Sequence, residues 1–307
     1  MMQLIKINKR EFYITGIALF SIIVLHAQTG NYNNLSGQDL TKASNPITTA
    51  VPFIAISPDA RAGGMGDGGV ATSADAYSIH WNASKLAFVE KDMGVGLTYT
   101  PWLKALIPDV NLEYLSGYYK TKKSGVFAGS VRYFTLGTIN FTDNGGNPIG
   151  SAKPNEFAID IAYARKLAKN FSMGGAVRYI NSSLTKGTFV DGAATHVGRS
   201  VAVDISATYK KQDLKLGDKK GIGTIGLNIS NIGNKMTYTS NNSTLNVANF
   251  LPMNMRLGGG LTINMDDYNS ITIVGEANKL LVPSPPVYKV DASGNKVVDA
   301  NGNYEVE

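Results

Sequence analysis

Two glycine patterns are the first candidates for chemistry, because glycines at this spacing can bring a backbone close to a phosphate. Gly64-Met65-Gly66-Asp67-Gly68-Gly69 and Gly221-Ile222-Gly223-Thr224-Ile225-Gly226 both match the letters of the fingerprint that binds a dinucleotide. That fingerprint needs a strand before it and a helix after it. The first pattern follows a loop with a proline, and the second lies within a strand pattern. We therefore expect these glycines to permit tight turns and close backbone packing.

The histidines are the second candidates. The chain has three histidines and no cysteine, and His80 and His196 lie far apart in the sequence. No Gly-x-Ser-x-Gly or His-Glu-x-x-His pattern is present. We therefore expect no catalytic residue, no metal ligand and no cofactor, and a protein that is not an enzyme. His80 is expected to be a hydrogen-bonding residue beside Trp81.

A short repeat near the C-terminus, Asp291–Asn295 and Asp299–Asn303, has letters that also occur in calcium-binding loops. It lacks the glycine at position six and the glutamate at position twelve that such a loop uses. Successive β-turns explain the same letters. Calcium binding is the weaker alternative.

The composition is typical of a β-barrel in a membrane. Charged residues make up 17% of the chain, there are 33 glycines, and tyrosine (15) outnumbers phenylalanine (11). A transmembrane strand shows only every second side chain to lipid, so the mean hydropathy stays modest. Without Lys6, Lys9, Arg10 and Glu11, the net charge falls from +6 to +4. An excess this small does not indicate nucleic acid as a partner.

The N-terminus predicts a secretory signal peptide over residues 1–27. Lys6, Lys9 and Arg10 form a positive n-region, and an apolar core follows from Phe12 to Leu25. This apolar core is shorter than the roughly 20 residues that a spanning helix needs.

Three further parts are expected after the signal peptide. They are a flexible periplasmic tail over 28–51, a Gly-rich plug-like segment over 52–90 and a β-barrel over 91–307. The stretch from Asp59 to Phe88 is expected to be buried in the barrel lumen, with Trp81 packed against inward-facing side chains.

Alternation of apolar and polar residues predicts strands along the rest of the chain. Nine segments show it: 93–101, 111–120, 125–134, 156–164, 171–179, 200–210, 225–230, 253–263 and 270–278. Each has about the length that a tilted transmembrane strand needs. Tyr133, Tyr163, Tyr179 and Tyr209 end apolar faces, as in an aromatic girdle. The expected fold is all-β, a transmembrane antiparallel β-barrel.

The connections between these segments alternate in length. Short turns (121–124, 166–170 and 264–268) alternate with long loops (136–154, 183–198 and 234–251), and 211–220 is an intermediate connection on the short side. Outer-membrane barrels have short periplasmic turns and long outer loops, and an even number of strands. We therefore expect a bacterial outer-membrane location with a periplasmic N-terminus. Because only nine strands are found, the barrel is expected to be incomplete at its C-terminal end.

Charged residues fall on the polar faces of the strands and are candidate lumen charges: Arg132, Asp160, Arg178, Asp204, Arg256 and Glu276. An Arg or Lys facing lipid near the midplane would cost about 2–4 kcal/mol. Both signs are present, so we expect salt bridges in a partly filled lumen and not an ion-selective pore.

The short turns are basic, and an outer loop is apolar. The basic residues are Lys122, Lys123, Arg165, Lys166, Lys169, Lys211, Lys215, Lys219 and Lys220. They predict a positive rim that touches lipid headgroups of the outer membrane or an acidic partner, and plain solubility is the alternative.

The apolar loop Pro101–Pro108 is expected to be a contact surface or to fold over the barrel mouth.

Five blocks of sequence carry a resemblance to a known family: Pro52-Phe53, Arg61–Asp67, Ala71–Ser73, Ser78–Phe88 and Glu276–Pro286. They resemble the PorV family of outer-membrane barrels in the type IX secretion system. The wider relatives are fatty-acid-transporter-like barrels, whose Asn-Pro-Ala-Gly-Leu motif is altered here to Asn82–Leu86. The family-motif residues, to which we assign a structural part, are Arg61, Gly64, Gly66, Asp67, His80, Trp81 and Asn82.

The resemblance implies a barrel of about fourteen strands in the full-length protein and a role without catalysis. It implies binding of the C-terminal signal domain of exported proteins, and their transfer from an outer-membrane translocon barrel to a sortase-like surface protease. The alternatives are a transporter of hydrophobic small molecules such as fatty acids, and an outer-membrane enzyme.

Overall fold

The computed structural model describes residues 47–283 except 103, 106–108, 124, 143–144, 185–188, 191–192, 240–247 and 267, together with residues 289 and 297. Residues Ile47–Ser284 belong to one structural unit. The expected signal peptide, most of the expected tail and both calcium-like repeats lie outside the described residues. None of the helices in the described part has the length and apolar composition needed to span a bilayer.

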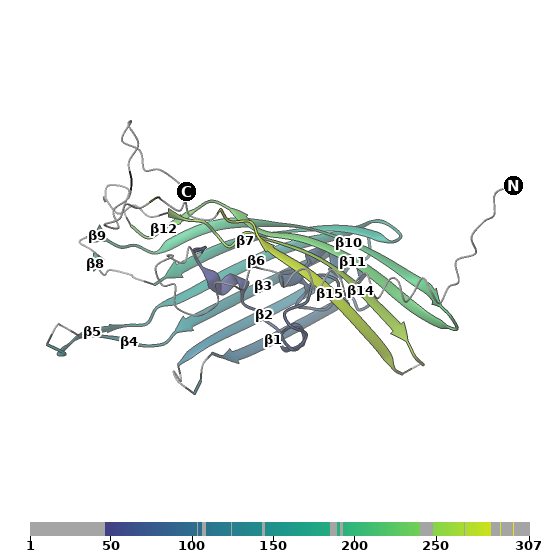
Figure 1. The fold of residues 1–307 in the computed structure, drawn as a ribbon, viewed down its shortest axis with the longest axis horizontal. Coiled ribbons are helices and arrows are strands. Elements are labelled where there is room, and N and C mark those ends of the chain that lie inside the picture. The colour runs from purple at the N-terminus through teal and green to yellow at the C-terminus, as the bar shows by residue number, and fades with distance from the viewer. Residues whose placement is uncertain are drawn as a thin grey trace. The chain divides into compact units, whose positions relative to one another are not determined.

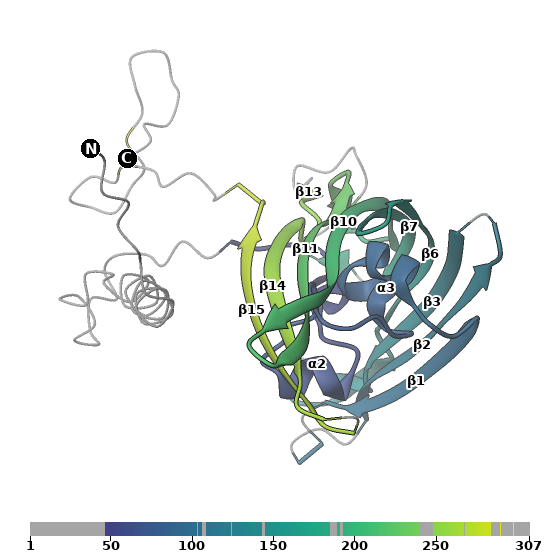
Figure 2. The same cartoon turned by 90° about the vertical axis from the view of Figure 1, so that its right-hand side faces the viewer.

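One curled antiparallel sheet of nine strands dominates this unit, and the strands follow one another in chain order (Figure 1). They are β1 (Met93–Pro101), β2 (Val110–Thr121), β3 (Gly125–Leu136), β6 (Asn155–Ala168), β7 (Phe171–Ser183), β10 (Gly198–Leu216), β11 (Lys219–Gly233), β14 (Asn254–Asn264) and β15 (Ser270–Leu280). The predicted nine strands and the all-β class are confirmed. The curled sheet has the shape of a half-barrel (Figure 2).

The two faces of the sheet have opposite polarity. In β6, Ala158, Asp160 and Ala162 are buried on the concave face, whereas Ile159 and Ile161 are exposed on the convex face. Ile161 keeps 69% of its surface exposed in the middle of its strand. An apolar convex face and a charged concave face are the reverse of a soluble sheet and fit strands that face lipid.

Aromatic residues form two rows across the convex face. Near the short turns, Tyr119, Phe127 and Tyr163 are direct cross-strand neighbours, because Tyr119 pairs with Phe127 and Phe127 with Tyr163. Near the opposite end, Tyr133 pairs with Phe157. Aromatic residues at two levels of the convex face resemble the aromatic girdles of transmembrane barrels.

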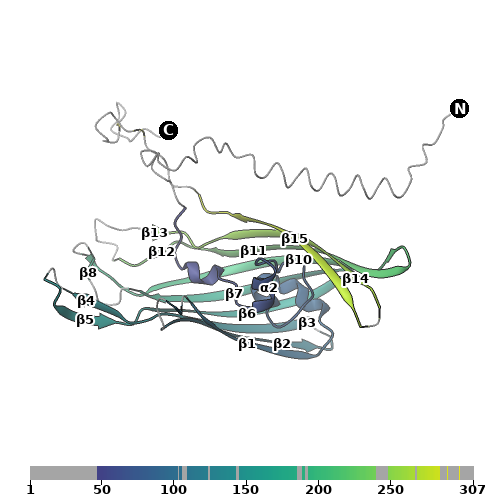
Figure 3. The same ribbon diagram turned by 60° about the horizontal axis from the view of Figure 1, so that its bottom comes forward.

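The connections differ sharply between the two ends of the sheet. The short turns all lie at one end, and three two-stranded hairpins lie at the other, which we call the hairpin end (Figures 1 and 3). The hairpins are β4–β5 (Ile139–Thr142 and Pro148–Ala152), β8–β9 (Phe189–Val190 and Ala193–Ala194) and β12–β13 (Met236–Thr237 and Ala248–Asn249). The sequence predicted long loops here, because strands this short leave little alternation to detect.

The prediction of a ten-residue connection over 211–220 is wrong, because β10 and β11 continue into this range. The turn is only Gly217-Asp218, with Gly217 at φ 65°. The paired register shifts between Lys211 and Leu214, where Asp213 adopts φ 59°. A bulge breaks the alternation, and charged residues on both faces hide the rest of it.

The segment before the sheet lies in its concave side (Figure 2). It contains η2 (Pro52–Ala55), α2 (Ala60–Gly64), α3 (Ser78–Trp81) and η3 (Ala83–Phe88). One core cluster joins Phe53 and Ile54 to Leu251 at the hairpin end, and another joins Ala87 to Val126 near the short turns. The segment therefore runs the length of the sheet before the chain enters β1.

Candidate functional site: the docked plug segment

We call residues 52–90 the plug segment. Two side chains fix its local structure. Asp59 caps α2 by accepting a hydrogen bond from the Ala62 N–H (2.9 Å), and its other oxygen accepts from Trp81 Nε1 (2.7 Å). Asn82 caps η3 through the Ser84 N–H (3.1 Å). Short capped helices of this kind need such partners because most of their backbone groups lie at an end.

Trp81 is the centre of the plug segment. Its ring is 2% exposed, meets His80 edge to face at 4.7 Å, and lies 4.6 Å from the guanidinium carbon of Arg256. A Cβ on Gly69 would overlap the Trp81 ring, so this glycine of the first pattern serves close packing. The predicted packing of Trp81 against inward-facing side chains is confirmed.

The first part of the stretch is exposed, which corrects the burial predicted for all of it. Arg61, Gly64, Gly66 and Asp67 are exposed, and α2 buries only Ala62. Arg61 pairs with the Asp75 carboxylate at 3.0 Å on the surface. Gly66 and Asp67 adopt left-handed φ values of 73° and 59°, which end the helix with a turn. Gly66 and Asp67 therefore reverse the direction of the chain after α2.

Glycines of the sheet form the surface on which the plug segment rests. A Cβ on Gly174 would lie 2.7 Å from the Ser84 nitrogen, and one on Gly260 would lie 2.7 Å from the Ala71 oxygen. A Cβ on Gly226 would overlap the Val70 carbonyl oxygen. The second glycine pattern therefore allows a backbone to approach a strand, as predicted, and no phosphate is needed to explain it.

Hydrogen bonds join the plug segment to β10 at the same place. Asn82 Nδ2 donates to the Val70 oxygen (2.9 Å) and to Thr208 Oγ1 (3.0 Å). The Ser84 N–H reaches Ser206 Oγ at 3.0 Å. These five polar groups satisfy one another, which supports one position of the segment along the strand.

Glu276 binds the plug segment from β15. One carboxylate oxygen accepts from the N–H groups of Gly69 (2.8 Å) and Val70 (2.9 Å), and the other faces Arg256 at 3.4 Å. Arg256 also donates to the Asp67 oxygen at 3.4 Å. Two strands thus hold the same turn of the plug segment through a shared ion pair.

Arg132 binds carbonyls and not a carboxylate. Its NH1 donates to the oxygens of Phe53 (3.0 Å) and Ile54 (2.7 Å) at the end of η2, and its NH2 donates to His80 Nδ1 (2.8 Å). A guanidinium only donates, so His80 Nδ1 must accept. Burial lowers the pKa of His80, as does the charge of Arg132, so the ring is neutral at neutral pH. The predicted lumen salt bridge therefore does not form at Arg132 in the described chain.

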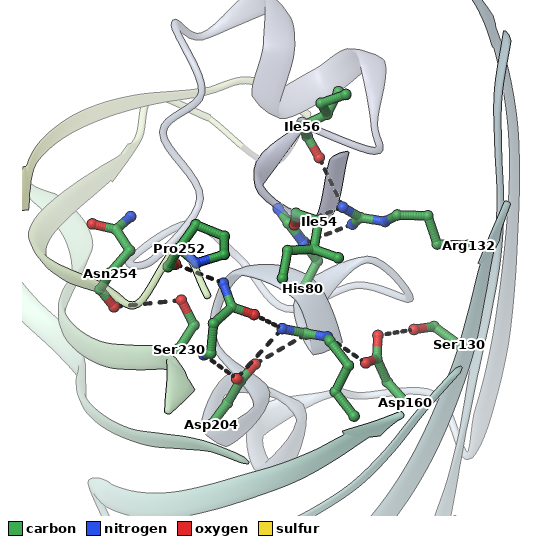
Figure 4. A network of polar contacts seen from close by, with 12 residues as sticks. Ile54, Ile56, His80, Ser130, Arg132, Asp160, Asp204, Ser230, Pro252 and Asn254 are labelled. Atoms are coloured by element: carbon green, nitrogen blue, oxygen red, sulfur yellow. Dashed lines mark hydrogen bonds and ion pairs between the residues drawn. The ribbon is translucent and has the colours of Figure 1, made fainter. Parts of the chain in front are cut away.

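The remaining three lumen charges form one network (Figure 4). Arg178 pairs with Asp160 at 2.6 Å and with Asp204 at 3.1 Å, and it also donates to Asn231. Asp160 accepts from Ser130 at 2.6 Å. A buried triad whose lone pairs are satisfied is costly to break, by about 3–5 kcal/mol for loss of one partner. This is a structural crosslink across β3, β6, β7, β10 and β11.

A cavity of ≈ 250 Å³ remains between the plug segment and the sheet. Its polar lining includes His80, Arg178, Asn231 and Arg256. His196 does not approach it and lies exposed in the loop before β10, where it contacts the Thr239 oxygen. Within the described residues, no group of three His, Cys, Asp or Glu side chains could hold a metal ion.

Lys85 is a buried lysine that the sequence did not single out. It is 2% exposed, and its Nζ donates to the Gly69 oxygen (2.5 Å) and to Thr72 Oγ1 (2.9 Å). Burial lowers the pKa of Lys85 from 10.5 to about 8, partly opposed by nearby carboxylates. The sequence predicted burial of the whole stretch from Asp59 to Phe88, but it gave no sign of which backbone groups would accept from Lys85.

The glycine surface yields a first prediction. Gly226→Ala should displace Val70 and weaken docking, because the added methyl overlaps a backbone oxygen. We expect a loss of about 1–3 kcal/mol, measured as a lower denaturant midpoint and faster protease cleavage near Arg61. Gly259→Ala is the matched control, because its Cβ would have a nearest neighbour at 3.9 Å. Equal stability of the two variants would contradict the docking geometry.

Lys85 yields a second prediction, on pH. Between pH 8 and 10.5 the folded chain has lost the Lys85 proton while the unfolded chain keeps it. The free energy of unfolding should therefore rise with pH across this window, by up to about 3 kcal/mol from this group. Urea unfolding at several pH values should show this rise in the wild type and in exposed-site Lys153→Gln, and a smaller rise in Lys85→Gln. An unchanged rise in Lys85→Gln would refute it.

The comparison with protein families agrees with this architecture. The family described as type IX secretion system protein PorV matches residues 39–287, which include the plug segment and all nine long strands. No curated protein matches the chain. The match covers most of the chain, and we conclude that this protein belongs to the PorV family of type IX secretion system proteins.

Proposed function

We propose that this secretion component binds the C-terminal signal domain of exported proteins and carries them from an outer-membrane translocon barrel to a sortase-like surface protease. Its family and its β-barrel-like fold suit an outer-membrane protein. The observation that carries the proposal is the docked plug segment, which is bonded to β3, β10, β14 and β15. A lumen crosslinked in this way supports recognition at the surface of the barrel.

The lumen gives less support to a transporter of hydrophobic small molecules. Such a transporter needs an enclosed pocket lined mainly by apolar side chains. The cavity beside the plug segment is lined by two arginines, His80, Ser230 and three asparagines as well as apolar residues. A long hydrocarbon would remove water from these groups without replacing their hydrogen bonds.

We propose that the short turns face the periplasm and that the hairpin end faces outward, as is general for outer-membrane barrels. The three hairpins then extend toward the translocon and cargo. Each hairpin is a separate two-stranded sheet that pairs with none of the nine long strands. The β12–β13 hairpin is anchored, because Met236 is buried in a core cluster with Ile180 and Ala202. The β4–β5 and β8–β9 hairpins are therefore the better candidates for contact with partners.

The plug segment enters this unit at the hairpin end. The Ala50 N–H donates to the Phe250 oxygen at 2.8 Å, and Phe53 stacks on Phe134 at 6.3 Å near the end of β3. In the proposed orientation this entry point lies on the outer side. Ala50 belongs to the tail predicted over 28–51, so the proposed orientation places the last residues of that tail on the outer side and not in the periplasm. Residues 1–46 lie outside the described chain.

The orientation is tested with epitope tags in intact cells. A tag inserted before Ile47 should bind antibody at the cell surface, and a tag in the turn Gly217-Asp218 should bind only after the outer membrane is permeabilised. Both positions lie away from the paired strand residues of the concave core. The reverse pattern would overturn the orientation.

The function is tested by deleting the gene and measuring delivery of secreted proteins to the cell surface. Delivery should be lost and should return with the wild-type gene, while fatty-acid uptake and surface esterase activity should not change. Normal delivery in the deletion strain would refute the proposal. Loss of fatty-acid uptake would favour a transporter, and loss of esterase activity would favour an enzyme.

A second arm separates partner contact from folding. Three variants each replace one hairpin with a short turn, and detergent-solubilised protein is tested for binding of a purified signal domain. At least one variant should lose binding while keeping the denaturant midpoint of the wild type. Cargo that lacks its C-terminal signal domain is the control and should not bind to any of them.

A further inference from the structure

Five cationic side chains meet at one cavity at the short-turn end of the sheet. They come from the ends of β2 and β6 and from the turn after β2: Lys120, Lys122, Lys123, Arg165 and Lys166. The cavity has a volume of ≈ 280 Å³, and no carboxylate lines it. Among the described residues, none of the five cations forms a salt bridge. This concentration of positive charge fits an anionic ligand.

The depth of this cavity relative to the membrane follows from the strand register. Tyr119, Phe127 and Tyr163 form the aromatic row on the convex face, and the rings of Phe127 and Tyr163 are 5.0 Å apart. Aromatic rows of this kind lie at the level of the lipid headgroups. Arg165 lies two residues beyond Tyr163, which is about 7 Å along a strand. The cations therefore lie at the depth of headgroup phosphates.

The plug segment holds two of the five cations in place. Lys120 Nζ donates to the Val89 oxygen at 2.8 Å, and Lys166 Nζ lies 4.9 Å from the centre of the Phe88 ring. The other three, Lys122, Lys123 and Arg165, are exposed at the rim. Docking of the plug segment thus builds the inner wall of the cavity and leaves its outer wall open to the membrane surface.

We propose that this cavity binds the phosphate of an anionic phospholipid in the leaflet next to the short turns. An apolar surface lies on the membrane side of the cavity, because Phe127 is 49% exposed and Ile161 is 69% exposed on the convex face. Acyl chains can lie against these side chains while the phosphate enters the cavity. An acidic peptide would match the charge but would leave this apolar surface without a partner, so a lipid is the better occupant.

The test uses the full chain reconstituted in nanodiscs of phosphatidylcholine and phosphatidylglycerol, from which the protein is extracted and its retained lipids are counted by native mass spectrometry. The wild type should retain phosphatidylglycerol over phosphatidylcholine. The triple variant Lys122→Gln/Lys123→Gln/Arg165→Gln should lower this preference about tenfold or more, given the usual contribution of each cation near a charged surface.

A matched control removes the same number of charges from a neighbouring turn. Lys211→Gln/Lys215→Gln/Lys220→Gln changes three exposed lysines that do not line the cavity, and it should keep the lipid preference. The denaturant midpoint of each variant reports folding. Equal loss in both triples, a wild type without preference for phosphatidylglycerol, or displacement of the bound lipid by an acidic peptide would each overturn the proposal. So would competition by inorganic phosphate as effective as that by phosphatidylglycerol.

Discussion

The structure depends on one constraint: charged side chains on the concave face must be paired or hydrogen-bonded within the protein. Alternation along each strand places Arg132, Asp160 and Arg178 on that face, and all three are less than 5% exposed. An unpaired charge there would cost several kcal/mol. Some of these groups pair within the sheet, but Arg132 donates to the carbonyls of Phe53, Ile54 and Ile56 and to His80, all in or next to the plug segment's short helices. The plug segment is therefore a required part of the fold.

The same constraint explains the glycines. Backbone N–H groups of the plug segment reach side chains such as Glu276 and Ser206 only if its backbone comes very close to the strands. Gly174, Gly226 and Gly260 provide the space. Close approach and polar pairing are thus two aspects of one interface, and a methyl group at the wrong glycine would separate donors from acceptors over several strands.

A lumen fixed in this way leaves the ends and the convex face for interaction. The hairpins at one end form no strand pairs with the long strands, and the other end carries a cluster of cations beside an aromatic row. This separation suits the proposed role, in which the protein stays rigid while it contacts other components of the type IX secretion system. In the described lumen, His80 accepts a hydrogen bond from Arg132 and has a structural part in docking the plug segment.

The sequence by itself determined the nine strands, the face on which the side chains lie where the alternation is unbroken, and the family. Alternation is a local signal of period two, so it needs no knowledge of distant residues. Only the tertiary structure decided which groups each buried polar side chain contacts. Arg132 binds backbone carbonyls nearly eighty residues away, Asn231 joins the Arg178 network, and Lys85 is buried beside Gly69. Such pairings depend on where the plug segment docks, and that position results from many long-range contacts acting together and not from any local pattern.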